Sequence, residues 1–192
     1  MLGRYKKIIE AKLRGLAKAA AVSGVSPNAL TLSGLLIGLA GLYPLYAYGC
    51  VPCFLLAAAL MAFMDMLDGL VARYTGKASK FGAFLDSTVD RAEDAVLVAA
   101  LMLSSVLTPA EGLTLLTGMF LISYARARAE GLGLHMSGVG LAERPERLLL
   151  ILAALAAYPV SFEAARIIAL GLLGIVYLTV AQRIAYAWRM LR

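Results

Sequence analysis

Charged residues are scarce in this chain of 192 residues, at 16%, whereas hydrophobic residues make up 61%. Soluble domains carry about 25% charged and about 45–50% apolar residues. The composition therefore excludes a soluble enzyme and a disordered chain. The two cysteines are too few for the disulfide framework of a small secreted protein. What remains is an integral membrane protein, and its continuous apolar runs favour helices over the alternating strands of a membrane barrel.

Six apolar stretches are long enough to cross a bilayer, which takes about 20 helical residues. They cover residues 29–48, 51–73, 82–107, 110–132, 144–160 and 163–189. Ahead of them, residues 1–22 combine apolar side chains at helical spacing with spread basic residues, which predicts an amphipathic helix in the membrane interface. We therefore expect an all-α integral membrane protein in which residues 1–192 form a single domain. It would comprise a juxtamembrane helix over 1–22 and a bundle of six transmembrane helices over 29–189.

Basic residues are distributed unevenly among the expected loops. If the N-terminus lies inside, every one of the 18 Lys and Arg residues except Arg166 falls on the inner side. Loops rich in Lys and Arg remain in the cytoplasm. We expect both termini on the cytoplasmic side of the cell membrane. Contact with anionic membrane lipids also accounts for the net charge of +6, so nucleic acid is not an expected partner.

All five aspartates lie between positions 65 and 94, inside otherwise apolar stretches. An ionisable residue within a membrane span is costly and indicates a function. Asp65 and Asp68 are three residues apart on one span, and Asp86 and Asp90 are four apart on the next, so each pair shares a helix face. The two pairs lie at matching distances from the inner loop that joins the spans. We expect the four carboxylates to converge near the cytoplasmic surface.

Four clustered carboxylates need positive charge beside them to stay ionised together. Because no histidine or cysteine is near in the sequence, the ligands of a bound metal would all be oxygens. Oxygen ligands select Mg²⁺ or Mn²⁺, with Ca²⁺ as an alternative. Two such ions would form a clamp for phosphoryl chemistry. Gly69 and Gly82 leave room for a diphosphate, although Gly69 could equally serve helix packing, and Arg73 is placed to pair with a phosphate.

The stretch from Asp65 to Asp90 reads DMLDGLVARYTGKASKFGAFLDSTVD. It fits the pattern D-x2-D-G-x2-A-R-x8-G-x3-D-x3-D at every fixed position. In this the chain resembles the CDP-alcohol phosphotransferase family, a group of six-span phospholipid synthases. The expected span number, the orientation and the basic N-terminal segment agree with the resemblance.

The resemblance implies roles for these residues. Asp65, Asp68, Asp86 and Asp90 would hold two divalent ions, and Asp90 would also be the general base that accepts the proton of an alcohol. The lipid donor would be CDP-diacylglycerol or CDP-archaeol, CMP would leave, and the enzyme would be a homodimer. The nucleotide and diphosphate site would comprise Asn28, Thr31, Asp68, Gly69, Ala72, Arg73 and Gly82. For Asn28 and Thr31 the alternative is a helix cap and a packing contact.

A second cluster, rich in arginine, lies at the inner ends of the last three spans. The stretches SYARARAEGLGL and AERPERLLLIL resemble the branch of the family that uses inositol 1-phosphate to make phosphatidylinositol phosphate or archaetidylinositol phosphate. This resemblance implies that Ser123, Arg126, Arg147 and Arg183 bind the phosphate of the acceptor. Bacterial members usually have lysine at the position of Arg126, so glycerol 3-phosphate stays open as an alternative acceptor. Any one of these arginines could instead be a plain membrane anchor.

Carboxylates within a membrane also occur in a different class of protein, the cation transporters. A transporter is expected to carry inverted repeats and sites at mid-membrane depth, and neither is evident in this sequence. Glu93 and Asp94 either support the metal site or face a neighbouring helix. Cys50 and Cys53, on the outer side, are expected to be free thiols rather than a local disulfide.

Overall fold

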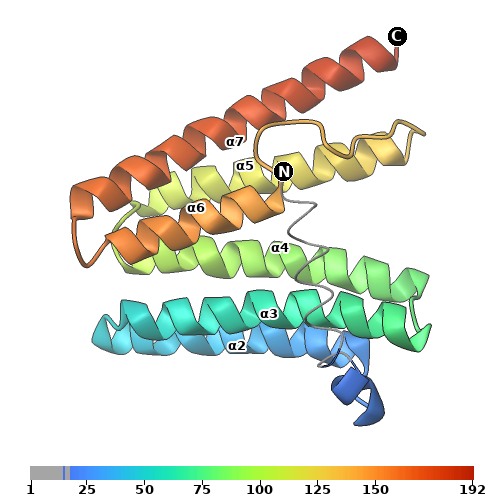
Figure 1. The fold of residues 1–192 in the computed structure, drawn as a ribbon. Helices are drawn as coiled ribbons and strands as arrows, with labels where there is room; N and C mark the ends of the chain where they lie inside the picture. Colours follow the sequence, from blue (N-terminus) through green and yellow to red (C-terminus); the bar gives the residue numbers. More distant parts are fainter. Residues whose placement is uncertain (1–14, 16–17) are drawn as a thin grey trace. The chain divides into compact units, whose positions relative to one another are not determined.

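The computed structural model describes residue 15 and residues 18–192. Its elements are α2 (Pro27–Tyr48), α3 (Val51–Thr75), α4 (Lys80–Leu103), α5 (Pro109–Glu130), α6 (Arg144–Ala157) and α7 (Phe162–Met190) (Figure 1). Each helix coincides with one predicted apolar stretch to within a few residues, which confirms the all-α prediction for the described part of the chain. Most of the helix predicted over 1–22 lies outside the described residues; its last residues, 18–22, are helical.

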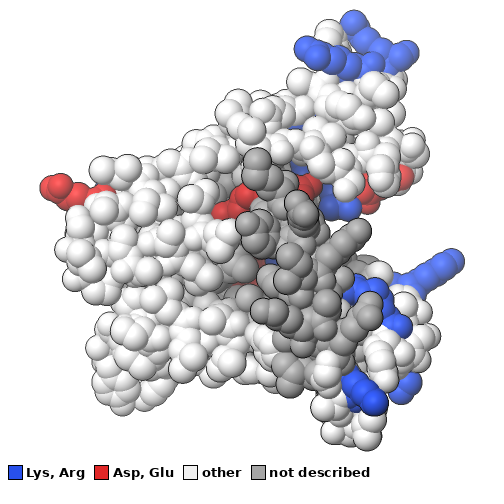
Figure 2. Space-filling view, viewed as in Figure 1, with Lys and Arg blue, Asp and Glu red and all other residues white. Residues whose placement is uncertain are grey.

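Three of these helices are both long and apolar enough to cross a membrane, namely α2, α3 and α7. The helix α4 carries carboxylates at Asp86, Asp90, Glu93 and Asp94, which lower its hydropathy. α6 has 14 residues, or about 21 Å of helix, whereas the hydrocarbon core of a bilayer is about 30 Å thick. The face in Figure 2 is mostly uncharged, and basic side chains gather at the C-terminal end of α7.

The helices begin where the sequence offers capping groups. The hydroxyl of Ser26 accepts a hydrogen bond from the backbone N–H of Ala29 at 3.2 Å, at the start of α2. α5 begins with a capping box between Thr108 and Glu111, and Ser161 caps α7. Such caps bind backbone N–H groups that have no partner within the helix. The caps help to fix where α2, α5 and α7 begin.

The chain forms two compact units. Unit 1 comprises the described residues up to Gly41 together with Leu56–Glu93. Unit 2 comprises Leu42–Leu55 and Asp94–Arg192. The helices α2, α3 and α4 are therefore each divided between the units, whereas α5, α6 and α7 belong wholly to unit 2.

In unit 1, α2 packs closely against α3. Leu30 of α2 forms a buried cluster with Leu67, Leu70 and Val71 of α3. Gly34 permits the approach: a Cβ atom there would lie 3.2 Å from the Cβ of Met64. Small residues at such crossings let helix backbones come together in membrane proteins. This packing fixes the segment of α3 that carries Asp65 and Asp68.

In unit 2, α7 packs against both α5 and α6. Gly118 of α5 faces α7 so closely that a Cβ atom there would lie 2.6 Å from Val176 Cγ1. Met119 and Ile122 of α5 and Leu172 of α7 are buried. The contact holds the arginine-bearing parts of α5 and α7 in one compact body.

A disulfide joins Cys50 to Cys53, so the expectation of free thiols was wrong. The two residues flank the first turn of α3, where a spacing of three brings their Cα atoms to 5.3 Å. Disulfides form at Cα separations of 4.4–6.8 Å. The spacing alone did not decide the matter, because Gly49 with its positive φ of 63° turns the chain just before Cys50.

Candidate metal and substrate sites

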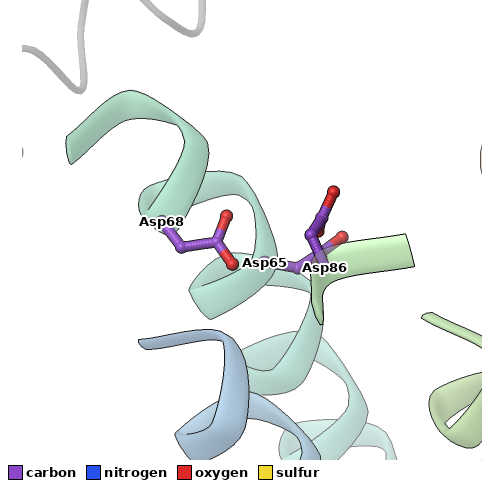
Figure 3. A group of neighbouring side chains, drawn as sticks. All are labelled: Asp65, Asp68 and Asp86. Carbon is purple, nitrogen blue, oxygen red and sulfur yellow. The ribbon is translucent and has the colours of Figure 1, made fainter. Parts of the chain in front are cut away.

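Three of the predicted aspartates converge in unit 1. Asp65 and Asp68 project from α3 and Asp86 from the first turns of α4 (Figure 3). Each offers one carboxylate oxygen, and these oxygens all lie within 4.8 Å of one another. The spacing of three residues places Asp65 and Asp68 on one face of α3, as the sequence predicts. The carboxylate of Asp68 is buried, with 5% of the residue exposed.

A second group of carboxylates shares a member with the first. Asp65, Asp90 and Glu93 also offer oxygens within 4.8 Å of one another. Asp90 thus joins the site through Asp65, and Glu93, whose role the sequence left open, lies beside it with 1% exposed. Two overlapping groups made of oxygen donors alone fit hard divalent ions such as Mg²⁺ and Mn²⁺.

Neighbouring side chains orient two of these carboxylates. The hydroxyl of Thr31 on α2 donates to Oδ2 of Asp68, and it lies 3.1 Å from the carbonyl oxygen of Pro27. Nη1 of Arg91 lies 3.1 Å from Oδ2 of Asp90 and donates to the carbonyl of Ser87. Thr31 therefore does more than pack against its neighbours. It connects the start of α2 to the carboxylates of α3.

A cavity of about 190 Å³ opens in unit 1 beside Asp68 and Asp86. Its wall contains every residue predicted for the CDP-lipid: Asn28, Thr31, Asp68, Gly69, Ala72, Arg73 and Gly82. Side chains at the two glycines would narrow it, since a Cβ on Gly82 would lie 3.4 Å from Oδ1 of Asn28 and a Cβ on Gly69 would lie 3.4 Å from Nη1 of Arg73. The structure thus places the seven residues around one space.

Sequence reasoning missed two polar residues of this cavity, Lys77 and Ser79. Both lie between α3 and α4, where Gly76 has a positive φ of 66°. The hydroxyl of Ser79 accepts a hydrogen bond from the N–H of Gly82 at 3.0 Å. Lys77 adds a second cation to Arg73. The available signal was the presence of two lysines, Lys77 and Lys80, within the eight unspecified positions of the motif.

The residues predicted for the acceptor phosphate lie in unit 2. Arg147 at the start of α6 and Arg183 of α7 are both 3% exposed. Arg183 experiences the like charges of Arg126 and Arg147, so its guanidinium group lies in the same part of unit 2 as theirs. Ser123, on α5, donates its hydroxyl to the carbonyl of Met119 at 3.1 Å.

Each of these arginines is held by protein oxygens. Nη2 of Arg147 lies 3.2 Å from Oδ2 of Asp94, and Nη1 donates to the carbonyl of Ala142 at 3.1 Å. Asp94, whose role was open, therefore pairs with a buried arginine. Arg126 differs, because its partner Glu130 is one helical turn away at 2.9 Å and both side chains are exposed.

Among the described residues, Arg183 donates its hydrogen bonds to two backbone carbonyls. Its Nε donates to the carbonyl of Val139 at 2.9 Å, and its Nη1 donates to that of Ile122 at 2.7 Å. The loop around Gly140 comes within reach because that glycine has a φ of 112°. These contacts fix the guanidinium between α5 and the segment before α6.

Arg166, the basic residue expected on the outer side, has a structural partner. Its Nη2 lies 2.8 Å from Oε1 of Glu111, and its Nη1 donates to Oε2 of the same carboxylate and to the carbonyl of Val106. The pair joins the start of α7 to the start of α5. It lies at the end of α5 away from Ser123.

Residues 24–182 match the CDP-alcohol phosphatidyltransferase family. The chain belongs to this family. It is 37% identical to the archaetidylinositol phosphate synthase of Methanothermobacter thermautotrophicus, over 100% of this chain and 96% of that protein. It is also 38% identical to the phosphatidylinositol phosphate synthase of Corynebacterium glutamicum, over 97% of this chain and 89% of that protein.

Solved structures of a phosphatidylinositol phosphate synthase also resemble this chain. The Mycobacterium tuberculosis phosphatidylinositol phosphate synthase with CDP-DAG bound superposes with a TM-score of 0.81 at 29% identity, covering 91% of this chain and 92% of that one. The same enzyme in complex with manganese and citrate gives a TM-score of 0.81, covering 91% and 88%. The chain is thus a multi-pass membrane enzyme of phospholipid synthesis, as the motif predicts, and not a cation transporter.

Proposed function

We propose that this transferase moves the phosphatidyl or archaetidyl group of a CDP-lipid to inositol 1-phosphate and releases CMP. The observation that carries the proposal is the group of Arg126, Arg147 and Arg183 in unit 2. Arginine is suited to phosphate because its planar guanidinium donates two parallel hydrogen bonds. An acceptor without a phosphate would have no use for three such groups. The names of the relatives support the same acceptor.

The proposal includes the arrangement in the membrane. Six transmembrane helices and an N-terminal interfacial helix form one domain over residues 1–192, with both termini and the active site on the cytoplasmic side. The distribution of basic residues supports this orientation. Because α6 is shorter than the hydrocarbon core, either the bilayer is thinner around it or neighbouring helices cover its ends. We also propose that the enzyme is a homodimer.

Asp65, Asp68, Asp86 and Asp90 hold two divalent ions, Mg²⁺ or Mn²⁺, in this proposal. Bound ions of this kind neutralise a diphosphate and stabilise the charge that develops on its oxygens. The support is the pair of carboxylate groups that share Asp65 and the manganese in the structure of a relative. Glu93, a member of the second group, adds a fifth carboxylate.

The chain's own residues bind the CDP-lipid and move one proton. Arg73 pairs with the diphosphate, and Gly69, Ala72 and Gly82 let it approach the backbone. Asn28 and Thr31 contact the nucleotide, while Thr31 also holds Asp68 in place. The hydroxyl oxygen of the acceptor forms a bond to the lipid-side phosphorus, and the bond from that phosphorus to the bridging oxygen breaks, so that CMP leaves. Asp90 accepts the hydroxyl proton, as a general base must.

In unit 2, Ser123, Arg126, Arg147 and Arg183 bind the phosphate of the acceptor. Arg147 and Arg183 are already fixed by protein oxygens and lose little side-chain freedom when they bind it. Arg126 must exchange its exposed partner Glu130, which costs little because exposed pairs are worth about 0.3–0.5 kcal/mol. The hydroxyl of Ser123 supplies a neutral donor.

The direct test is CMP release from CDP-diacylglycerol and from CDP-archaeol by the purified enzyme with Mg²⁺ or Mn²⁺. We expect release with inositol 1-phosphate and background release with unphosphorylated inositol. CMP release with glycerol 3-phosphate but not with inositol 1-phosphate would show that the alternative acceptor is the correct one. Equal rates with inositol and inositol 1-phosphate would remove the phosphate-binding role of the arginines.

A further inference from the structure

A second cavity, in unit 2, has walls that are almost wholly apolar. It has a volume of about 550 Å³ and lies among the C-terminal half of α5, the segment that follows it and the end of α7. Its wall includes Leu121, Leu132, Ile184 and Leu191, each of which is about 40% exposed or more. In a membrane enzyme such a surface is open to hydrocarbon chains.

Arginines interrupt this apolar wall. Arg128 and Arg192 are exposed members of it. The guanidinium of Arg192 lies 4.2 Å from the centre of the Trp188 ring, and Trp188 also lines the cavity. Figure 2 shows the basic side chains that gather at this end of α7. A long arginine side chain can lay its stem on apolar surface while its charge reaches the headgroup level.

The combination selects the chemistry of the occupant. A hydrocarbon chain can pack against an apolar wall. Two exposed guanidinium groups can bind a phosphate by donating paired hydrogen bonds to its oxygens. A lipid with net negative charge satisfies both, whereas a zwitterionic lipid brings a cation that offsets the attraction. We propose that this cavity binds an anionic phospholipid, with one chain against the apolar wall and the headgroup phosphate on Arg128 and Arg192.

This lipid site is distinct from the acceptor residues of α5. Leu121, Ala125 and Arg128 recur at steps of three or four and share one face of α5, whereas Ser123 and Arg126 lie on another. Arg183 reaches the wall of the cavity, but the proposal gives it no phosphate. The proposal therefore does not rest on the identity of the acceptor.

Trp188 makes the site measurable, because it is the single tryptophan of the chain. Bromine atoms on a lipid chain quench tryptophan fluorescence on contact. The full-length enzyme is placed in phosphatidylcholine vesicles with increasing fractions of brominated phosphatidylglycerol or, separately, brominated phosphatidylcholine. We expect saturable quenching with phosphatidylglycerol at a lower fraction than with phosphatidylcholine.

Arg128→Gln and Arg192→Gln should each raise the half-quenching fraction of phosphatidylglycerol about five-fold, since one basic residue near an anionic surface contributes about 1 kcal/mol. Each variant is normalised to its own fluorescence without bromine, because Arg192 touches the indole. Arg189→Gln is the matched control: it removes a charge of the same helix end outside the cavity wall, and it should leave the fraction unchanged. CMP release should stay at the wild-type rate in Arg128→Gln.

Three results would overturn the proposal. Equal quenching by both lipids would mean that ordinary surrounding lipid touches Trp188. An effect of Arg189→Gln as large as that of Arg128→Gln would mean that general surface charge attracts the lipid. Absence of quenching by either lipid would mean that protein, such as a second copy of the chain, covers the cavity.

Discussion

Unit 1 and unit 2 differ in the groups that surround their charged side chains. In unit 1, carboxylates from α3 and α4 lie within 4.8 Å of other carboxylates. In unit 2, buried arginines lie against protein oxygens, as Arg147 does with Asp94 and Arg183 with two carbonyls. The first arrangement gathers like charges, whose mutual repulsion raises the free energy of the folded state and favours the binding of cations. In the second, protein oxygens bind each buried guanidinium group directly, although Arg126 and Arg147 also act on Arg183 with like charge.

Because of this difference, we expect the stability of the two units to respond to different changes. Divalent ions should stabilise unit 1, because a ligand that binds only the folded state adds to the free energy of unfolding. Unit 2 should instead be sensitive to loss of its internal partners, because removal of one member of a buried ion pair leaves an uncompensated charge. Substitutions and added ions can test this contrast, from the largest expected effect to the smallest.

Asp90→Asn should reduce the rate of CMP release about 10²–10⁴-fold, because general base catalysis contributes an acceleration of that order. Binding of the CDP-lipid, measured by titration calorimetry, should persist, since the other carboxylates and the cavity wall remain. Ser87→Ala, one turn earlier on the same helix and exposed, is the control and should keep its rate. A near-normal rate in Asp90→Asn would rule out its role as the base.

Arg147→Ala should raise the KM for the phosphorylated acceptor much more than the KM for the CDP-lipid. Truncation of a buried charge that binds a ligand typically costs 2–5 kcal/mol, so an increase of about 10²-fold is expected. Equal changes in both KM values would remove Arg147 from the acceptor site.

Asp94→Asn tests the partner of Arg147. It should shift the same KM in the same direction, and Asp94→Glu should partly restore it. Glu111→Gln is the matched control, because it weakens the pair of Arg166 with Glu111, a different arginine–carboxylate pair of unit 2 at the start of α5. That variant should lower the midpoint of thermal unfolding without changing either KM. A KM change in Glu111→Gln as large as that in Asp94→Asn would mean that any loss of packing disturbs the site.

Mn²⁺ or Mg²⁺ should raise the thermal unfolding midpoint of the detergent-solubilised enzyme. At 100 times the dissociation constant a single bound ion adds about 2.7 kcal/mol to the free energy of unfolding. Asp65→Asn should abolish the gain, since Asp65 belongs to both carboxylate groups. Glu163→Gln, which removes an exposed carboxylate at the start of α7, should keep it. An equal gain in Asp65→Asn would place the ions elsewhere.

Gly118→Ala should lower the free energy of unfolding by about 1–3 kcal/mol, because the new methyl would overpack the contact of α5 with Val176. Gly171→Ala is the matched comparison within α7. No other atom lies within 4 Å of a Cβ at that position, so the better helix propensity of alanine should raise stability by up to about 1 kcal/mol. Chemical denaturation followed by circular dichroism measures both variants. Equal effects would contradict the close approach of α5 and α7.

Local patterns predicted much of this molecule. The helices follow from the apolar runs, and the convergence of Asp65, Asp68 and Asp86 follows from spacings on two helices that a short loop joins. Seven residues of the cavity wall in unit 1 were also predictable, because they belong to one motif and to the start of α2. These inferences needed only contacts between neighbouring segments.

Contacts between distant segments were not predictable from one sequence. Asp94 and Arg147 are 53 residues apart, and no periodicity connects them. Glu93 joins the carboxylates because α2 and α4 approach at Gly34, where a Cβ would lie 3.4 Å from Oε1 of Glu93. Lys77 reaches the cavity because the chain turns at Gly76. In each case the decisive information is the path of the backbone.

Glu111 connects the starts of two helices in unit 2. Its one carboxylate receives the backbone N–H and the hydroxyl of Thr108 and also the guanidinium of Arg166. The beginning of α5 is thereby clamped to the beginning of α7. If the proposed acceptor binds in unit 2, we therefore expect any accompanying movement of α5 and α7 to be smallest at this end and largest at their other ends.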